Sequence, residues 1–511
     1  MDAPRPPAHL AAVPLPPPHR PPGPPLWPQQ VSSPQPRLLV VAVLVGILAA
    51  VAVPGHLVGL GALVTLVVGA AAMWLASPRR WSRSSLVTLA LGLPLLVPTV
   101  LRDDTTYPFV ALHVALLLGA VACTGATGAL GMMLSALAWP LSAVRGLPLL
   151  ARTVTTLTPG RGSASALRTT VVSLVMLAVF GGLLGSADAI LGSWADRVVP
   201  TVDLWLVARV VVGSTVAGVL LAGLYLAINP PPVGALRLET RTARRIPPLE
   251  WQVPLAVVLA VLAAFFLAQT VGMLAGHDYV LSTTGLTYAE YARQGFAQLT
   301  LATALVLTLV AGVRTWGRAD RPRDRTIMQV MLAGLCLLGL ALVASALHRM
   351  ALYQDAFGWT VTRVTADLVE IWLGLVLLAT LVTIVRPALR PYLGRAALFC
   401  GAALVTLWSC GNVPAFVAER NIARFHATGR IDAPYLGQLG GDAAPTVVRS
   451  DLPEPTKACA LAFLSTNRDH GAADGILGWN LARNRARTAL AATDPDTLPA
   501  ARECSSDSLP R

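Results

Sequence analysis

Residues 361–385 read VTRVTADLVEIWLGLVLLATLVTIV, and the part from Ile371 to Val385 contains no charged residue. A helix of about 20 apolar residues crosses the ~30 Å hydrocarbon core of a bilayer and satisfies its own backbone hydrogen bonds there. Ten further apolar stretches lie at residues 38–54, 57–76, 85–101, 107–124, 168–187, 203–227, 252–275, 294–313, 326–347 and 395–411. The sequence therefore predicts an all-α polytopic membrane protein with about eleven transmembrane helices.

The overall composition supports the same class. Hydrophobic residues make up 55% of the chain and charged residues 13%, which is about half of the charged share in a soluble domain. The net charge of +13 comes from basic residues that are all arginine except Lys457, and most of them lie in loops between spans. Membrane topology explains such arginines better than nucleic-acid binding does. We expect contact with the lipid bilayer and no nucleic-acid partner.

The arginine-bearing loops alternate with loops that are neutral or acidic. The arginine groups lie at residues 79–83, 145–168, 237–245, 314–325 and 386–395. Eleven crossings place all of these groups on the cytoplasmic side, as the positive-inside rule requires. The shorter apolar stretch at residues 130–144 is then an interfacial or re-entrant helix on the cytoplasmic face. The alternative is a twelfth span, with one arginine loop outside.

This topology puts the N-terminus in the cytoplasm and the C-terminus outside the plasma membrane. Residues 1–36 are rich in proline and are expected to be disordered or extended, serving either as a linker or as a docking segment for a protein partner. Residues 37–411 form the helical bundle, and residues 412–511 form a small, polar, helical external domain. An oxidising exterior would allow a disulfide between Cys459 and Cys504, although two free thiols are the alternative.

Two polar segments interrupt the apolar pattern near the external side. Residues 282–296 read STTGLTYAEYARQGF, and residues 361–370 carry three charged side chains at helical spacings of i, i+4 and i+7. The first two of these, an arginine and an aspartate, can pair within a helix, and an arginine from another helix would then pair with the glutamate. The candidate external polar cluster contains Arg209, Tyr288, Glu290, Arg293, Gln294, Arg363, Asp367 and Glu370. Ionisable residues within spans usually mark a cavity, a proton relay or a substrate site, whereas the alternative is a salt-bridge network that fixes helix register.

Four runs in the chain resemble a known family. The runs at residues 285–296, 357–363, 412–421 and 429–436 are similar to those of uncharacterised bacterial multi-pass membrane proteins, catalogued as a domain of unknown function of the 4153/4173 type. The resemblance extends over roughly residues 84–490. It implies an integral protein of the bacterial plasma membrane, and it implies no agreed activity.

The sequence leaves three functional readings open, and its motifs do not point to an enzyme, a cofactor or a metal site. Its six cysteines form no C-x-x-C pair and have no histidine at zinc spacing. The first reading is a transporter or channel for a small polar or anionic solute. The second is a membrane enzyme that acts on an envelope or lipid-linked substrate, with Glu290, Asp367 or Glu370 as acid or base. The third is a sensor or scaffold protein. The oligomeric state is open in all three.

Overall fold

The structure of the protein is a computed structural model. It describes residues 27–157, 204–233, 246–275, 295–466 and 475–491, together with a few single positions in the segments 169–184 and 493–504.

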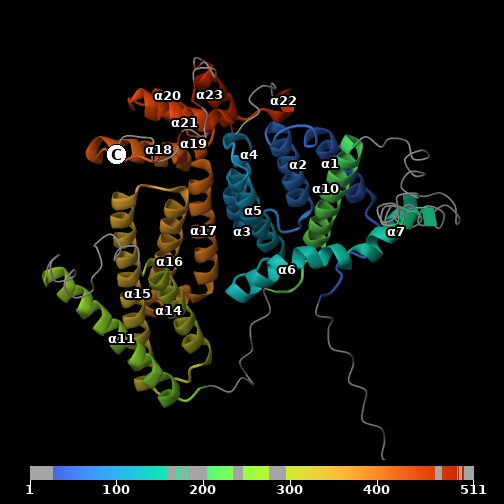
Figure 1. Ribbon diagram of the computed structural model, residues 1–511. Helices are drawn as coiled ribbons and strands as arrows, with labels where there is room; N and C mark the ends of the chain where they lie inside the picture. Colours follow the sequence, from blue (N-terminus) through green and yellow to red (C-terminus); the bar gives the residue numbers. More distant parts are fainter. Residues whose placement is uncertain are drawn as a thin grey trace, which may run out of the picture.

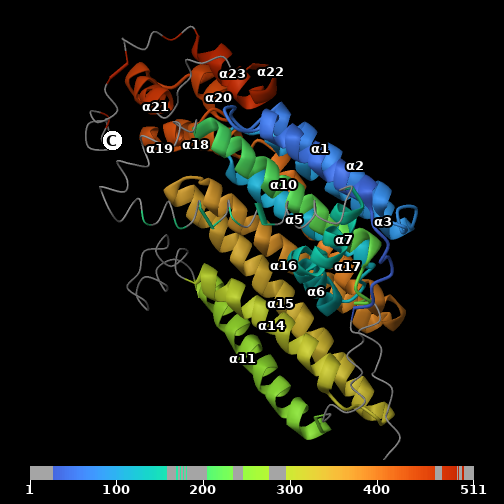
Figure 2. The same cartoon turned by 90° about the vertical axis from the view of Figure 1, so that its right-hand side faces the viewer.

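The bundle consists of two groups of helices that lie side by side (Figures 1 and 2). The first group contains α1 (Pro36–Ala52), α2 (Leu60–Ala76), α3 (Arg83–Gly92), α4 (Pro98–Leu101), α5 (Thr106–Thr124), α6 (Ala129–Arg145), α7 (Leu147–Leu157) and α10 (Leu204–Ile228). The second contains α11 (Pro248–Ala275), α14 (Phe296–Trp316), α15 (Pro322–Phe357), α16 (Val361–Val385) and α17 (Leu393–Cys410). In the first group α1 packs along α10 and α3 along α5, and in the second α15 lies between α14 and α16. Helix α17 contacts both α16 and α5, so it joins the two groups.

The contact between α1 and α10 depends on two glycines. A Cβ atom on Gly46 would lie 2.7 Å from the carbonyl oxygen of Gly213, and a Cβ atom on Gly213 would lie 2.9 Å from that of Gly46. Only glycine lets the two backbones approach this closely. Small residues at such contacts are a common means of packing helices within membranes.

The lengths of the helices indicate a membrane protein. Within the described residues, eight helices are long and apolar enough to cross a bilayer: α3 with α4, α5, α10, α11, α14, α15, α16, and α17 with the short turn before it. Helices α1 and α2 are also apolar but only 17 residues long. The span expected at residues 168–187 falls mostly outside the described residues. An all-α membrane protein is therefore what the structure supports, and the count of eleven spans stays a prediction.

The stretch at residues 130–144 forms α6, which differs in direction from its neighbours. Figure 1 shows α6 running across the axes of α5 and α10, and α7 continues from it after a bend of 41°. The hydroxyl groups of Thr124 and Ser135 hydrogen-bond at 2.7 Å and attach α6 to the end of α5. A helix in this direction suits a membrane surface, although its placement relative to the bilayer stays a prediction.

The residues after the bundle form a helical domain on one end of it (Figure 1). Its helices are α18 (Val413–Thr428), α19 (Ala433–Gln438), α20 (Ala444–Arg449), α21 (Glu454–Thr466), α22 (Gly475–Gly478) and α23 (Leu481–Leu490). Its buried core includes Val417, Leu436 and Val447, and the same cluster continues into Tyr107 of α5 and Trp408 of α17. The domain therefore shares its core with the bundle. Within it, Cys459 and Cys504 are joined by a disulfide.

A buried ion pair fastens this domain to the bundle. Arg102, at the end of α4, contacts the Asp442 carboxylate at 2.8 Å and donates a second hydrogen bond to the Cys410 carbonyl oxygen, also at 2.8 Å. The other Asp442 carboxylate oxygen accepts a hydrogen bond from the Asp103 backbone N–H at 3.0 Å. Burial raises the pKa of Asp442, and the Arg102 guanidinium only partly offsets that effect. Because desolvation is this costly, the pair serves to fix the position of the domain more than to add stability.

A second attachment involves the connection between α15 and α16. The Asn421 side chain of α18 accepts a hydrogen bond from the Trp359 backbone N–H at 2.8 Å and donates one to the Trp359 carbonyl oxygen at 2.9 Å. Arg424 donates to the carbonyl oxygens of Asp355 and Ala356 at 2.8 and 2.6 Å, at the end of α15. These bonds satisfy polar backbone groups where α15 ends.

The buried pair gives a stability test. An Arg102→Met variant leaves the Asp442 carboxylate buried without its partner, so we expect it to lose ~3 to 5 kcal/mol of unfolding free energy. The double variant Arg102→Met/Asp442→Leu should recover part of that loss, because an apolar pair needs no desolvation, although it removes the bonds to the Asp103 N–H and the Cys410 carbonyl oxygen. Thermal unfolding in detergent, with trypsin release of the C-terminal domain as a second readout, measures both.

The matched control is Arg449→Met, because Arg449 is exposed and bonds within its own helix. It should leave the melting temperature unchanged. An Arg102→Met protein as stable as this control would contradict the role given to the pair.

Candidate functional site

The site lies in the second group of helices, where α16 faces α14 and α15. Helix α16 begins at Val361 because the Thr360 side chain caps it, accepting a hydrogen bond from the Arg363 N–H at 3.2 Å. From this start, Asp367 and Glu370 fall on the face that turns toward the neighbouring helices. The same face continues through Leu377, which is fully buried in the apolar core of this group.

Glu370 is buried without a partner. Its side chain has an exposed fraction of 0%, and neither carboxylate oxygen has a hydrogen-bond partner among the described residues. The hydroxyl groups of Thr300 and Thr303 of α14 lie within hydrogen-bonding reach of it. Their hydroxyls donate hydrogen bonds to the carbonyl oxygens of their own helix, at 3.1 and 2.9 Å.

The two threonines leave one kind of bond available to Glu370. A hydroxyl whose hydrogen is already donated keeps lone pairs that accept. A protonated carboxylic acid can donate to such an oxygen, whereas a carboxylate cannot. An isolated charge in an apolar interior is also very costly. The surroundings of Glu370 therefore suit a carboxyl group that carries a proton.

Asp367 is one turn away and is half satisfied. One of its carboxylate oxygens accepts a hydrogen bond from the Gln354 amide of α15 at 2.7 Å, and Gln354 itself is only 2% exposed. The other oxygen is buried and has no partner within the described part of the chain. Two carboxyl groups so close together cannot easily both be charged, so their protonation is coupled. A second polar contact, between Gln269 of α11 and Ser345 of α15 at 3.0 Å, lies in the same group of helices.

The expected pairing of Arg363 with Asp367 is wrong. The Arg363 guanidinium donates instead to the carbonyl oxygens of Phe357 and Gly358, and it lies 4.0 Å from the centre of the Tyr353 ring. These acceptors end α15 and are in reach because α16 starts only a few residues later. The arginine therefore stabilises the connection between the two helices and leaves Asp367 to Gln354.

Arg209 does not join the cluster either. It is an exposed residue of α10, which packs against α1, α2, α5 and α6 in the first group. Figure 1 shows α17 and α5 between α10 and α16. Four other members of the candidate cluster, Tyr288, Glu290, Arg293 and Gln294, lie outside the described residues. The structure thus brings together Asp367 and Glu370, and it adds Gln354, Thr300 and Thr303.

The sequence gives only weak indications that Gln354, Thr300 and Thr303 belong to the site. Thr300 and Thr303 are three residues apart, which places them on one face of α14, but threonine is common in membrane helices and usually bonds to its own backbone. Gln354 lies beyond the apolar stretch that predicted α15. Among the described residues no group of three or more histidine, cysteine, aspartate or glutamate side chains could hold a metal ion. The chemistry that the site offers is proton binding by two coupled carboxyl groups.

The fold and this buried acid pair define a polytopic helical membrane protein with ionisable groups inside its bundle. A family model described as a domain of unknown function, DUF4153, matches residues 86–450, which is most of the chain and includes all of α16. The chain belongs to this family. Searches among curated proteins and among solved structures found no match.

Replacing the buried Glu370 side chain is predicted to raise the stability of the protein, whereas most substitutions lower it. A Glu370→Leu variant removes a buried carboxyl group whose only polar neighbours on α14 are two hydroxyls that already donate to their own helix, so we expect the protein to gain ~1 to 3 kcal/mol of unfolding free energy. Gln354→Leu should instead lose a similar amount, because it deprives Asp367 of its hydrogen bond. Thermal unfolding of both variants in the same detergent compares the two effects. If Glu370→Leu is the less stable of the two, Glu370 has a structural partner after all.

Proposed function

We propose that this protein is a proton-coupled transporter of a small polar or anionic solute in the plasma membrane, with Glu370 as its proton-binding group. The observation that carries the proposal is the complete burial of Glu370 with neither oxygen paired among the described residues. Such a group lowers stability in an apolar bundle, and ionisable residues in this position characteristically belong to proton relays and ion pathways.

The neighbouring groups support a relay better than they support an enzyme site. Asp367 lies one helical turn from Glu370 and interacts with it electrostatically, and Gln354 holds it in place from α15. Both acids face packed helices, whereas an enzyme that acts on an envelope lipid needs its acid or base beside an open substrate site. These contacts do not test whether the protein is a sensor or scaffold. They also do not test whether a protein partner docks on the proline-rich tail, so both ideas stay proposals.

We also propose an orientation, with the C-terminal domain outside and the N-terminus in the cytoplasm. Arg79, Arg314 and Arg395 lie at the end of the bundle opposite that domain, where Arg79 donates to the Thr124 carbonyl oxygen at 2.6 Å. The segment at Trp27 lies at the same end, because its indole N–H donates to the Asn229 carbonyl oxygen at 2.6 Å. The positive-inside rule favours a cytoplasmic location for this end. The disulfide of the opposite domain suits an oxidising exterior.

Reconstitution tests the transport proposal. The purified protein in proteoliposomes that contain a pH-sensitive dye should move protons when a panel of small carboxylates, phosphates and amino acids is added outside. Glu370→Gln keeps the shape of the neutral acid but cannot release a proton, so we expect at least about a tenfold loss of proton flux, equivalent to ~1.4 kcal/mol or more. Asp355→Asn is the matched control, because Asp355 is an exposed acid next to Gln354 at the end of α15.

Two outcomes would contradict the proposal. One is that the proteoliposomes are as impermeable to protons as protein-free vesicles, whichever compound of the panel is added. The other is a Glu370→Gln protein that moves protons as fast as Asp355→Asn.

Labelling in intact cells tests the orientation. A membrane-impermeant maleimide should modify Asp451→Cys and spare Arg83→Cys, in a chain that lacks the free cysteines Cys123, Cys336, Cys400 and Cys410. Peptide mapping without reduction, after lysis in an alkylating agent, should recover Cys459 linked to Cys504. External labelling of Arg83→Cys would contradict the orientation, and two alkylated thiols in the domain would contradict the disulfide.

A further inference from the structure

Two apolar cavities that are open at the surface lie next to each other in the first group of helices. One, of about 490 Å³, lies between α2, α3, α5 and α10. The other, of about 560 Å³, lies between α5, α6 and α10. His113, Leu116, Trp139, Thr215 and Val219 line both, so the two cavities adjoin, and together they are here called the α2–α10 groove. Sites of this size hold small hydrophobic ligands in other proteins.

The length of the groove matches one leaflet of a bilayer. Its wall on α2 runs from Thr65 to Ser77, and its wall on α3 runs from Ser85 to Leu96. At 1.5 Å per residue the α2 wall is about 18 Å long. Half of the ~30 Å hydrocarbon core is about 15 Å. An acyl chain from one leaflet would therefore fill the groove along its length.

Two glycines keep the groove open. Gly69 on α2 and Gly92 on α3 both line it, and a Cβ atom added to either would have no other atom within 4 Å. In most of the bundle, glycines serve instead for close contact, as Gly46 and Gly213 do. The missing side chains at Gly69 and Gly92 thus leave space that no part of the described chain fills.

Among the described residues, the one arginine that lines the groove lies at one end of it, whereas the uncharged polar side chains of Thr65, Thr88, His113, Ser214 and Thr215 line it elsewhere. Ser77, Arg80 and Ser85 line it where α2 turns into α3. Arg80 donates one hydrogen bond, to the Leu75 carbonyl oxygen at 2.7 Å, and has no acidic partner within the described residues. The rings of Trp74 and Trp81 pack edge to face beside it at 5.0 Å. Tryptophan and arginine in this arrangement are typical of the level of the lipid headgroups.

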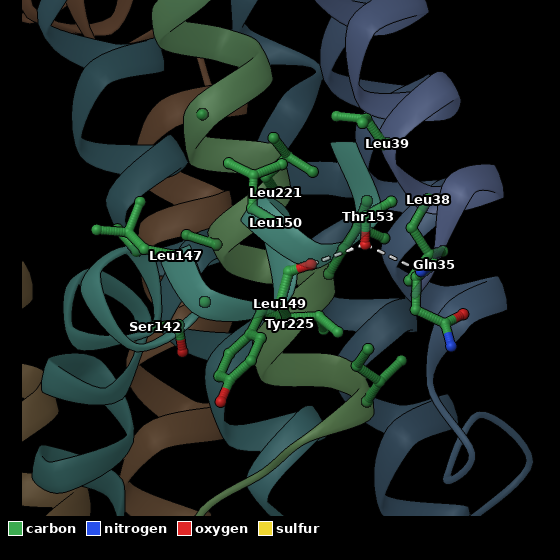
Figure 3. A pocket seen from close by; sticks show the side chains of 16 residues that line it. Gln35, Leu38, Leu39, Ser142, Leu147, Leu149, Leu150, Thr153, Leu221 and Tyr225 are labelled. Carbon is green, nitrogen blue, oxygen red and sulfur yellow. Dashed lines mark hydrogen bonds between the residues drawn. The ribbon is translucent and has the colours of Figure 1, made fainter. Parts of the chain in front are cut away.

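A smaller cavity nearby lacks these features. It has about 270 Å³ and lies between α1, α6, α7 and α10 (Figure 3). The Thr153 hydroxyl at its rim accepts a hydrogen bond from the Gln35 backbone N–H at 3.0 Å and donates one to the Leu149 carbonyl oxygen at 2.8 Å. No arginine lines it. Its polar side chains Ser142 and Thr153 bond within the protein, and it lacks the arginine and the tryptophan pair that mark the end of the α2–α10 groove.

We propose that the α2–α10 groove is a binding site for an anionic phospholipid, whose acyl chains occupy the groove and whose phosphate contacts Arg80. The lipid comes from the leaflet on the arginine-rich side of the bundle. This site is separate from Asp367 and Glu370, which lie in the other group of helices, and it does not depend on the transport proposal. Basic pockets between transmembrane helices are known to bind anionic headgroups by the same electrostatic attraction.

Photo-crosslinking tests the site. The full-length protein in nanodiscs is exposed to phosphatidylglycerol or phosphatidylcholine that carries a diazirine in its acyl chain, and adducts are mapped by mass spectrometry. We expect adducts on the peptides that contain Gly69, Gly92 and Leu116, with about fivefold more from phosphatidylglycerol, which is the preference one arginine near a membrane surface supplies.

Four variants separate the headgroup from the chain. Arg80→Ala should abolish the preference for phosphatidylglycerol, while Arg83→Ala, an exposed arginine of the same connection that does not line the groove, should retain it. Gly69→Leu places a side chain in the groove at a position where a Cβ atom meets no other atom within 4 Å, so it should reduce adducts from both lipids several-fold even if Arg80→Ala fails to fold. Gly312→Leu, on α14, should leave labelling unchanged.

Three results would overturn the proposal. The first is equal labelling of the wild type by the two lipids. The second is labelling spread evenly over all lipid-facing helices. The third is an Arg83→Ala protein that loses the preference as fully as Arg80→Ala does.

Discussion

Polar groups inside an apolar helix bundle must find partners, and the rest of this structure follows from that constraint. Most of the buried polar groups described above obey it. Arg102 and Asp442 pair at 2.8 Å, Asn421 takes both the N–H and the carbonyl oxygen of Trp359, and Thr303 donates to its own helix. These groups hold the C-terminal domain and the helices in register. Glu370 departs from the rule with two unpaired oxygens, which is why it stands out as the functional group.

The helices could be predicted because the thickness of a bilayer sets their length. The stretch 361–385 coincides with α16, and the stretch 107–124 differs from α5 by one residue. The prediction fails where a helix leaves the apolar region. The stretch 326–347 became α15, which continues to Phe357, because its last turns lie against the C-terminal domain, where Arg424 bonds to their carbonyl oxygens. Hydropathy contains no information about such contacts.

The site could be predicted only in part. The spacing of Asp367 and Glu370 placed both acids on one face of α16. The same spacing misled for Arg363, because carbonyl oxygens at the end of α15 and the Tyr353 ring compete for its guanidinium. Arg209 was misplaced because a single sequence does not say which helices are neighbours. For the same reason the α2–α10 groove could not be predicted, since Gly69 and Gly92 belong to different helices.

The central claim is that Glu370 is a neutral, proton-carrying acid inside the bundle. Infrared spectroscopy tests it directly, because a protonated carboxyl group has a carbonyl stretch that a carboxylate lacks. In a detergent that lacks ester groups, the wild type at neutral pH should show this band, Asp355→Asn should retain its full intensity, and the difference spectrum of Glu370→Gln should show that one component of it is lost. Wild-type and Glu370→Gln spectra that agree in this region would contradict the account, because Glu370 would then be charged and would need a partner that the described residues do not supply.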